Sequence, residues 1–218
     1  MTGEALATTA RRRPEVNIFL HWLGRLVFRV LGFRVEGDIS NVDKAVIIAG
    51  PHTSNLDGLF MIFTAWIIRR RLDWMVKAEL VRGPLGWLIR WAGGVPIDRS
   101  ASFNAVEQAV QAFNQRERML LAVAPEGTRK KKDHWKTGFY WIAVGAQVPL
   151  IIACMDYNRK TVFLHTPPMN PTGNLEQDIE VIWAYYQPEM ARYPEKFNDK
   201  RLRPSQMDKT MGVTNTEA

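Results

Sequence analysis

The chain has 218 residues, of which 46% are hydrophobic, and it carries a formal net charge of +7 at pH 7. This length suits one domain with a sizeable core and leaves little room for two, so a single α/β or α+β domain with appendages is expected. The single cysteine, Cys154, excludes a disulfide framework and a cysteine-rich zinc site, and it fits a reducing compartment.

The positive charge favours an anionic partner, such as nucleic acid, a phosphate-bearing substrate or an acidic membrane surface. The composition favours lipid, because eight Trp, ten Phe and nine Met accompany 29 Lys and Arg, and Trp beside basic residues is typical of a membrane interface. A well-filled hydrophobic core is the alternative explanation of these large side chains.

Residues 1–14 are polar and end in a run of three arginines before Pro14, so a disordered basic leader without a signal peptide is expected. Residues 16–33 (VNIFLHWLGRLVFRVLGF) repeat apolar side chains at helical spacing, which predicts an amphipathic helix within the segment 15–35. Arg25 and Arg29 make it a poor membrane span, because a crossing needs about 20 apolar residues and a central arginine is unfavourable there. We expect a helix lying in the membrane interface, and a helix that packs on the core is the alternative.

Beyond residue 43, apolar runs of strand length alternate with stretches of helical periodicity. Strands are expected at 44–50, 73–80 (with a turn), 119–129 (ending in a loop), 148–155 and 161–165, and helices at 59–70, 101–116 and 136–146; residues 84–100 read as an amphipathic helical turn broken at 93–96. Asn55 or Asp57 is expected to cap the helix at 59–70.

This alternation predicts an α/β fold. We expect a single domain at 36–198 with a mixed, largely parallel sheet flanked by helices, followed by a flexible polar tail at 199–218. Polar stretches follow the strand ends, so the functional site is expected at the carboxyl edge of the sheet.

His52 is the one histidine with a carboxylate close by in a polar turn at a strand end. An imidazole takes a proton from a hydroxyl near neutral pH if its second nitrogen is held, and Asp57 is placed to fold back beneath His52 and hold it. A simple capped turn explains the same spacing. Ser54 suggests a hydrolase-like set, but the chain has no Gly-x-Ser-x-Gly elbow, so the substrate's own hydroxyl is the expected nucleophile.

Three further stretches suggest contacts to an anion. The segment APEGTRKKK (124–132) joins a glycine loop, which offers backbone N–H donors, to four consecutive cations that begin at Arg129. Glu126 is expected to order the arginine or bind an acceptor hydroxyl. Arg99 follows a tight turn, and Lys77 ends a strand; both suit a phosphate contact, although either cation would be equally ordinary on a surface.

In this order the stretches resemble the glycerophospholipid acyltransferase superfamily, which contains the 1-acyl-glycerol-3-phosphate acyltransferases. HTSNLD (52–57) resembles its His-x4-Asp block, GVPIDR (94–99) its second block, PEGTR (125–129) its third and VPLII (148–152) its fourth. The resemblance covers roughly residues 44–156. Pro51 stands where an Asn is common, and Ile152 where a second proline is usual, which leaves the acceptor and the acyl pocket undetermined.

The resemblance implies acyl transfer by general-base catalysis without an acyl-enzyme. By this analogy His52 deprotonates the acceptor hydroxyl and Asp57 orients His52. Substrate-binding roles are implied for Lys77, Arg99, Glu126, Gly127, Thr128 and Arg129. Acyl-CoA or acyl-acyl-carrier protein would be the co-substrate, with no other cofactor and no metal.

The expected function is transfer of a fatty acyl group to a lysophospholipid, first of all 1-acyl-glycerol-3-phosphate, in phospholipid biosynthesis at the cytoplasmic face of a membrane. Three alternatives are a thioester or lysolipid hydrolase, an acyltransferase for a non-glycerol lysolipid, and a basic binding module without turnover. The ordered blocks argue against the binding module, and no nucleic-acid partner is expected.

Overall fold

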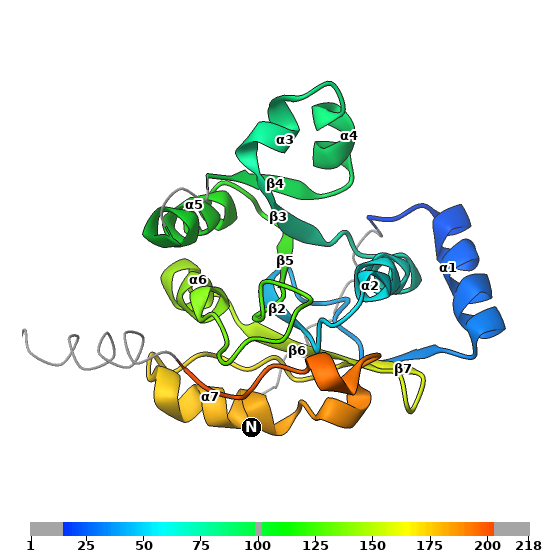
Figure 1. Cartoon of the computed structure of the whole chain (residues 1–218). Helices are drawn as coiled ribbons and strands as arrows, with labels where there is room; N and C mark the ends of the chain where they lie inside the picture. Colours follow the sequence, from blue (N-terminus) through cyan, green and yellow to red (C-terminus); the bar gives the residue numbers. More distant parts are fainter. Residues whose placement is uncertain (1–14, 99–101, 203–218) are drawn as a thin grey trace, which may run out of the picture.

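The computed structural model describes residues 15–98 and 102–202. The predicted leader at 1–14 and Arg99 lie outside this range, as does the tail beyond residue 202. Figure 1 shows helices on both faces of a central sheet.

The sheet has seven strands in the order β1-β7-β6-β2-β5-β3-β4. The strands are β1 (Arg34–Glu36), β2 (Lys44–Gly50), β3 (Asp73–Lys77), β4 (Gly94–Ile97), β5 (Met119–Val123), β6 (Leu150–Asp156) and β7 (Thr161–Leu164). Neighbouring strands are parallel except β6 and β7, which pair antiparallel. The structure therefore confirms the predicted mixed, largely parallel sheet.

The helices divide the core into two sides (Figure 1). They are α1 (Ile18–Leu31), α2 (Asn55–Ile67), α3 (Ala78–Arg82), α4 (Gly86–Trp91), α5 (Ser102–Asn114), α6 (Gly138–Ala146) and α7 (Leu175–Ala184), with two short 3-10 turns, η1 (Pro188–Met190) and η2 (Pro194–Lys196). Along β2, Val46 and Ile48 pack toward α5 and α6, whereas Ala45 and Ile47 pack toward α2. After Lys44 this central strand is entirely apolar, because helices cover both of its faces.

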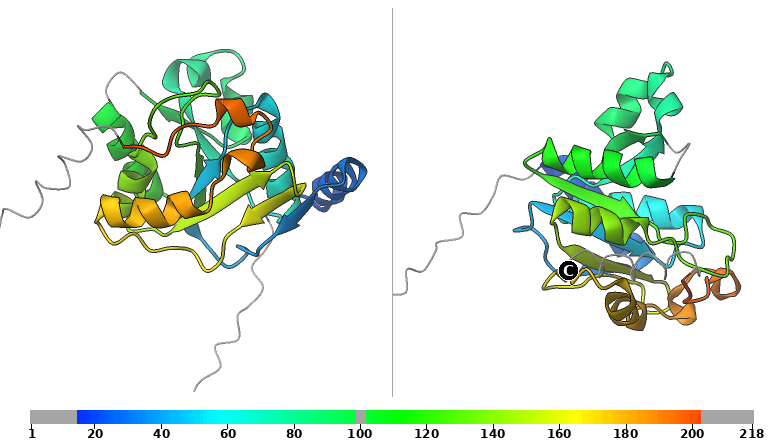
Figure 2. Two further views of the ribbon diagram at one scale, coloured as in Figure 1. Left: turned by 60° about the horizontal axis from the view of Figure 1, so that its bottom comes forward. Right: turned by 90° about the vertical axis from the view of Figure 1, so that its left-hand side faces the viewer.

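The helix α1 packs mainly against the outer side of α2, as Figures 1 and 2 show, and its Phe28 joins a buried cluster with Met155 of β6 and Val162 of β7. Its buried residues are Gly24 and Phe28, and Phe28 contacts Phe60 of α2. Among the described residues, no helix has both the length and the apolar character that are needed to cross a bilayer.

Several elements differ from the sequence-based expectation. The helix expected at 59–70 begins at Asn55, because Ser54 is its N-cap. Most of the Gly-Gly-Val-Pro stretch, read as a break, belongs to strand β4 (Gly94–Ile97). The proline is tolerated there because β4 lies at the edge of the sheet. The elements β1, α3 and α7 were not predicted. The first two are too short to show a clear periodicity of apolar residues. In addition, β1 spans the boundary that the sequence analysis placed between the N-terminal helix segment and the domain, at residues 35 and 36.

The helices α3 and α4 form a projecting unit between β3 and β4, which we call the α3–α4 hairpin (residues 78–91) (Figures 1 and 2). Its interior is tightly closed, because Val81 and Gly86 are buried against each other. A Cβ atom added at Gly86 would lie 1.9 Å from the carbonyl oxygen of Val81. Only glycine allows this approach of the two helices.

We expect the substitution Gly86→Ala to lower the free energy of unfolding by about 2 kcal/mol or more, because the added methyl group must push α3 and α4 apart. Gly58→Ala is the matched control, since a Cβ there meets nothing within 4 Å and alanine favours a helix by up to about 1 kcal/mol. Urea unfolding of both variants measures this difference. Equal stabilities would contradict the close packing.

Candidate active site

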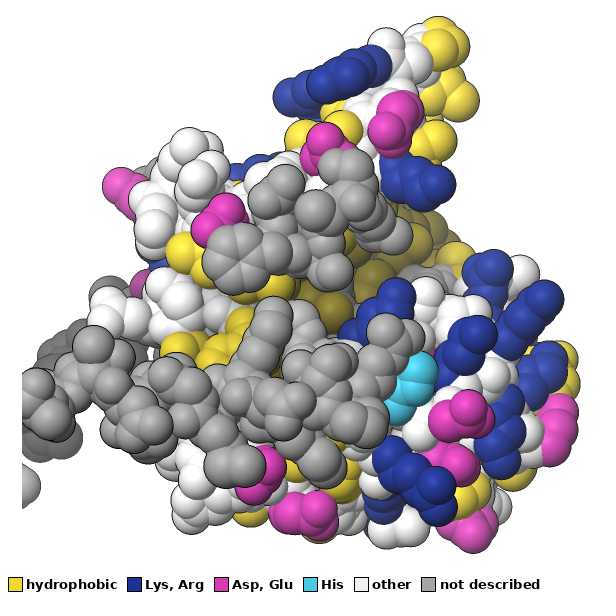
Figure 3. Space-filling view, turned by 60° about the vertical axis from the view of Figure 1, so that its left-hand side comes forward, with side chains coloured by type: hydrophobic (Ala, Val, Ile, Leu, Met, Phe, Trp, Pro, Cys, Tyr) yellow, Lys and Arg dark blue, Asp and Glu magenta, His cyan; other side chains and the backbone are white. Residues whose placement is uncertain are grey.

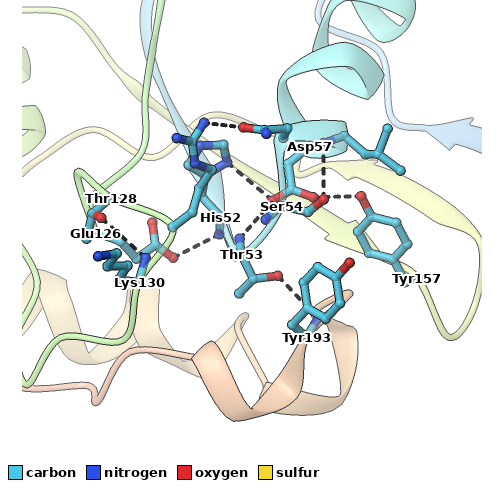
Figure 4. Close-up of polar contacts among 12 residues, drawn as sticks. His52, Thr53, Ser54, Asp57, Glu126, Thr128, Lys130, Tyr157 and Tyr193 are labelled. Carbon is cyan, nitrogen blue, oxygen red and sulfur yellow. Dashed lines mark hydrogen bonds and ion pairs between the residues drawn. The ribbon is translucent and has the colours of Figure 1, made fainter.

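The predicted His–Asp pair and the predicted glycine loop converge at the carboxyl ends of β2 and β5. His52 lies in the turn between β2 and α2, and Glu126 lies in the loop that follows β5 (Figure 4). The two strands are parallel neighbours, with Ile48 opposite Val123. Parallel pairing thus brings together two segments that are 74 residues apart in the sequence.

Asp57 both caps α2 and holds His52. Its Oδ2 atom accepts hydrogen bonds of 2.8 Å from the backbone N–H groups of Thr53 and Ser54. The Ser54 side chain in turn accepts a bond from the first turn of α2, which completes a capping box. The same Oδ2 atom lies 3.3 Å from Nδ1 of His52. The capped turn and the His–Asp pair are therefore one structure, not alternatives.

A tyrosine that the sequence reading missed binds the second oxygen of Asp57. The hydroxyl group of Tyr157 donates a 2.6 Å hydrogen bond to Oδ1 (Figure 4). Tyr157 follows β6, which pairs with β2 on the side opposite β5. Its place next to the site depends on the strand order, which the sequence pattern does not reveal.

The charge of Asp57 is well supported. Burial raises the pKa of Asp57, but the contacts with His52, Tyr157 and the backbone of Ser54 outweigh burial and hold the pKa below its usual value. The carboxylate is therefore ionised at neutral pH. With Nδ1 of His52 facing this carboxylate, Nε2 is the nitrogen left to exchange a proton with a ligand, and the side chain keeps 27% of its surface exposed.

Glu126 lies behind His52 and is 4% exposed. Its Oε1 atom accepts a 3.1 Å hydrogen bond from the backbone N–H group of His52. Burial raises the pKa of Glu126 to about 7. The carboxyl group thus fixes the backbone of the histidine, whereas Arg129, which we expected it to order, donates a hydrogen bond to the side chain of Asn55 at the start of α2.

The loop after Glu126 carries exposed positive charge beside the His–Asp pair. Gly127 adopts a φ of 62°, a conformation that favours glycine. Thr128 turns the chain by accepting a hydrogen bond from the backbone of Lys130. Through its bond to Asn55, Arg129 lies next to the turn that holds His52. The loop is thus placed to attract an anionic ligand to the histidine.

The structure does not place the other two cations predicted to bind substrate beside the His–Asp pair. Lys77 is exposed at the carboxyl end of β3, on the same sheet edge but two strands from β2. Arg99 falls outside the described residues. Within residues 15–98 and 102–202, no group of three or more His, Cys, Asp or Glu side chains is arranged to hold a metal ion.

The segment between α7 and residue 196 also supports the site, and the sequence reading missed it. The backbone N–H group of Tyr193 donates to the hydroxyl oxygen of Thr53 at 3.3 Å, and the backbone N–H group of Tyr157 donates to the carbonyl oxygen of Met190 at 2.9 Å. The guanidinium group of Arg192 lies 5.9 Å from the ring centre of Tyr157. No local pattern in this segment signals these contacts.

The raised pKa of Glu126 makes stability depend on pH. Between its usual pKa of 4.5 and about 7, the folded protein keeps the proton that the unfolded chain releases. The free energy of unfolding should therefore fall as the pH rises through this interval, by up to about 3 kcal/mol.

In Glu126→Gln this contribution should disappear, because the amide oxygen still accepts the bond from His52 but does not titrate. Urea unfolding between pH 4.5 and 8 measures the difference between variant and wild type, and Glu79→Gln at an exposed position is the control. Parallel pH profiles for wild type and Glu126→Gln would contradict the prediction.

Comparisons with known proteins support the resemblance that the four sequence blocks indicate. A family model with the description Acyltransferase matches residues 32–156, a range that contains all four blocks. The 1-acyl-sn-glycerol-3-phosphate acyltransferase of Salmonella typhimurium is 30% identical over 175 residues, which cover 75% of this chain and 69% of that protein. The enzyme of the same name from Escherichia coli is 28% identical over the same shares.

The crystal structure of the 1-acyl-sn-glycerophosphate (LPA) acyltransferase from Thermotoga maritima aligns with 92% of this chain and 80% of its own, at 21% identity and a TM-score of 0.48. The family match spans more than half of the chain, and the Salmonella typhimurium relative shares 30% identity over most of both proteins. The chain therefore belongs to the acyltransferase family.

Proposed function

We propose that this acyltransferase moves a fatty acyl group from a thioester, acyl-CoA or acyl-acyl-carrier protein, to the free hydroxyl of a lysophospholipid. The observation that carries the proposal is the His52–Asp57 pair, placed beside the cationic loop that begins at Arg129. The first candidate acceptor is 1-acyl-glycerol-3-phosphate, because its phosphate suits this loop and the named relatives are acyltransferases for that compound.

The proposed reaction has two proton transfers. Nε2 of His52 takes the proton of the acceptor hydroxyl as its oxygen attacks the thioester carbonyl carbon, and Asp57 stabilises the imidazolium. The tetrahedral intermediate then collapses, the C–S bond breaks, and the imidazolium returns its proton to the leaving thiolate. The thioester already activates the acyl group, so no metal and no cofactor other than the acyl donor is proposed.

We also propose that α1 contacts the membrane that holds the acceptor, at its cytoplasmic face. Phe19, Trp22, Leu26 and Val30 of α1 are all exposed, while Phe28 packs inward on α2. A helix with an exposed apolar face and arginines along it is suited to the lipid interface. In this arrangement α1 would bind the membrane, and the residues near His52 would bind the phosphate of the acceptor.

Product analysis by mass spectrometry tests the reaction. Wild type, incubated with mixed acyl-CoAs, acyl-carrier protein thioesters and a panel of lysolipids, should yield a new diacyl product. In His52→Ala the rate should fall about 100- to 10,000-fold, because the general base is lost. His165→Ala is the matched control, since His165 packs on Tyr185 away from the pair.

The same assay contains the outcomes that would contradict the proposal. Free fatty acid released at a rate independent of the acceptor would identify a hydrolase. Diacyl product formed equally well by wild type and His52→Ala would remove His52 from the reaction. Each donor and acceptor is resolved by mass, so the assay also chooses between CoA and carrier-protein thioesters.

Tyr157→Phe tests the support of Asp57. The variant loses a hydrogen bond that fixes the carboxylate of Asp57, so the histidine is held less precisely. We expect kcat to fall roughly tenfold, which equals about 1.4 kcal/mol in the barrier, while KM for the acceptor stays similar. The pKa of Asp57 should rise without this bond, which strengthens its hold on the imidazolium and moves the acidic limb of the kcat profile to higher pH. Tyr185→Phe is the control, and an unchanged pH profile in Tyr157→Phe would argue against this positioning role.

A further inference from the structure

We propose that the α3–α4 hairpin is a second lipid-contacting element, which inserts its apolar tip into the surface of an anionic membrane. The inference deepens the proposed function and rests on it, because it names how the catalytic edge of the sheet is held against lipid. It is carried by the exposure, charge and position of the hairpin.

The hairpin turns its large apolar side chains outward. Trp87 and Trp91 are 69% and 70% exposed, and Leu85 is 62% exposed. Trp91 lies on the same face of α4 as Trp87 and Leu88, because it follows them by four and three residues. In a helix of a water-surrounded domain this face would normally be polar. In the α3–α4 hairpin this face instead carries large exposed apolar side chains.

These side chains have no place in the interior of the hairpin. The space between α3 and α4 is already closed by Val81 and Gly86, where even a methyl group would meet the backbone at 1.9 Å. A Cβ atom at Gly94 would lie 2.5 Å from the side chain of Ile89, so the base of the hairpin is equally tight. The exposure of Trp87 and Trp91 is therefore built into the fold and needs an external partner.

The charges around the tip suit an anionic surface. Lys77, Arg82 and Arg90 are exposed on or beside the hairpin, and Glu79 is its exposed acidic residue. Figure 3 shows hydrophobic side chains gathered on the projecting hairpin with Lys and Arg side chains next to them. Tryptophan flanked by basic residues matches the interface of a bilayer, where the ring lies at headgroup depth and the cations meet phosphates.

The position of the hairpin links it to the proposed membrane face of α1. In Figure 1, α2 lies between α1 and the hairpin, so exposed apolar surfaces flank the helix that carries Asp57. Leu59, near the start of α2, is itself 43% exposed. Figure 3 shows a hollow with hydrophobic side chains on its floor beneath the hairpin. Two lipid contacts would hold the carboxyl edge of the sheet at the bilayer surface, where acyl chains enter.

A lipid surface fits these observations better than a protein partner. An acidic carrier protein would bind to the cations, but it would not explain why the tryptophan side chains are exposed. A second copy of this chain carries the same positive charges on the same face, so a symmetric contact would bring like charges together. The lipid interface accommodates both features at once.

A fluorescent label reports directly on insertion. Cys154 is buried, so a cysteine introduced at Leu85 can be labelled selectively with an environment-sensitive dye. On vesicles of phosphatidylglycerol and phosphatidylethanolamine, the label at position 85 should brighten and shift to the blue, as should a label at Trp22 of α1. A label at Val181, exposed on α7, should not respond. Vesicles of phosphatidylcholine alone should bind more weakly, because they lack the negative charge.

A double variant, Trp87→Glu with Trp91→Glu, gives a second measurement. Its partition coefficient onto anionic vesicles should fall about tenfold or more, and its turnover of a vesicle-embedded acceptor should fall with it. Its turnover of a short-chain, monomeric acceptor should match that of wild type, because the substitutions lie outside the residues assigned to the reaction. Val181→Glu is the matched control.

Three results would overturn the inference. The first is a label at position 85 that stays silent on vesicles while the label at position 22 responds. The second is a label at position 85 that responds to an acyl-carrier protein, or to a higher protein concentration, but not to vesicles; the third is a loss of turnover of the monomeric acceptor in the double variant. Absence of acyl transfer by wild type would instead defeat the proposed function, and the vesicle fluorescence would still decide whether the hairpin enters lipid.

Discussion

The arrangement of the site depends on one carboxylate. Asp57 accepts hydrogen bonds from the backbone N–H groups of Thr53 and of Ser54, the N-cap of α2. It also faces Nδ1 of His52 and accepts the hydroxyl hydrogen bond of Tyr157. The start of α2, the orientation of His52 and the contact with Tyr157 after β6 therefore all depend on this one carboxylate. A substitution here would remove a helix cap as well as a catalytic partner, so its effects on stability and turnover would be coupled. Glu126 complements Asp57 from behind, because it fixes the backbone of His52 while Asp57 fixes its ring.

The parts of this structure that the sequence revealed are those encoded locally. The continuous apolar run of β2 predicted a buried strand, and the polar turn after it correctly located the His–Asp pair, because both signals lie within fourteen residues of chain, 44–57. The glycine loop after β5 was equally visible. Parallel α/β architecture then placed both at one edge of the sheet, which the strand order confirms.

The parts that could not be predicted depend on long-range neighbours. Tyr157 reaches Asp57 because β6 lies beside β2, and Tyr193 reaches Thr53 across 140 residues. The burial of Glu126, which raises its pKa, follows from packing around a motif that reads as an exposed basic loop. The edge strand β4 was hidden by glycines and a proline, which disfavour a central strand but are tolerated at an edge.

The contact between Tyr193 and Thr53 has a consequence for the order in which the site is assembled during synthesis. Residues 32–156, which contain every block of the family match, leave the ribosome before Tyr157 and before the segment around Tyr193. A nascent chain at that stage carries the histidine, the aspartate and the cationic loop without the hydroxyl that braces Asp57 or the backbone group that meets Thr53. The contacts that brace the turn around His52 therefore form only after Tyr157 and the segment around Tyr193 have been synthesised, later than all four blocks.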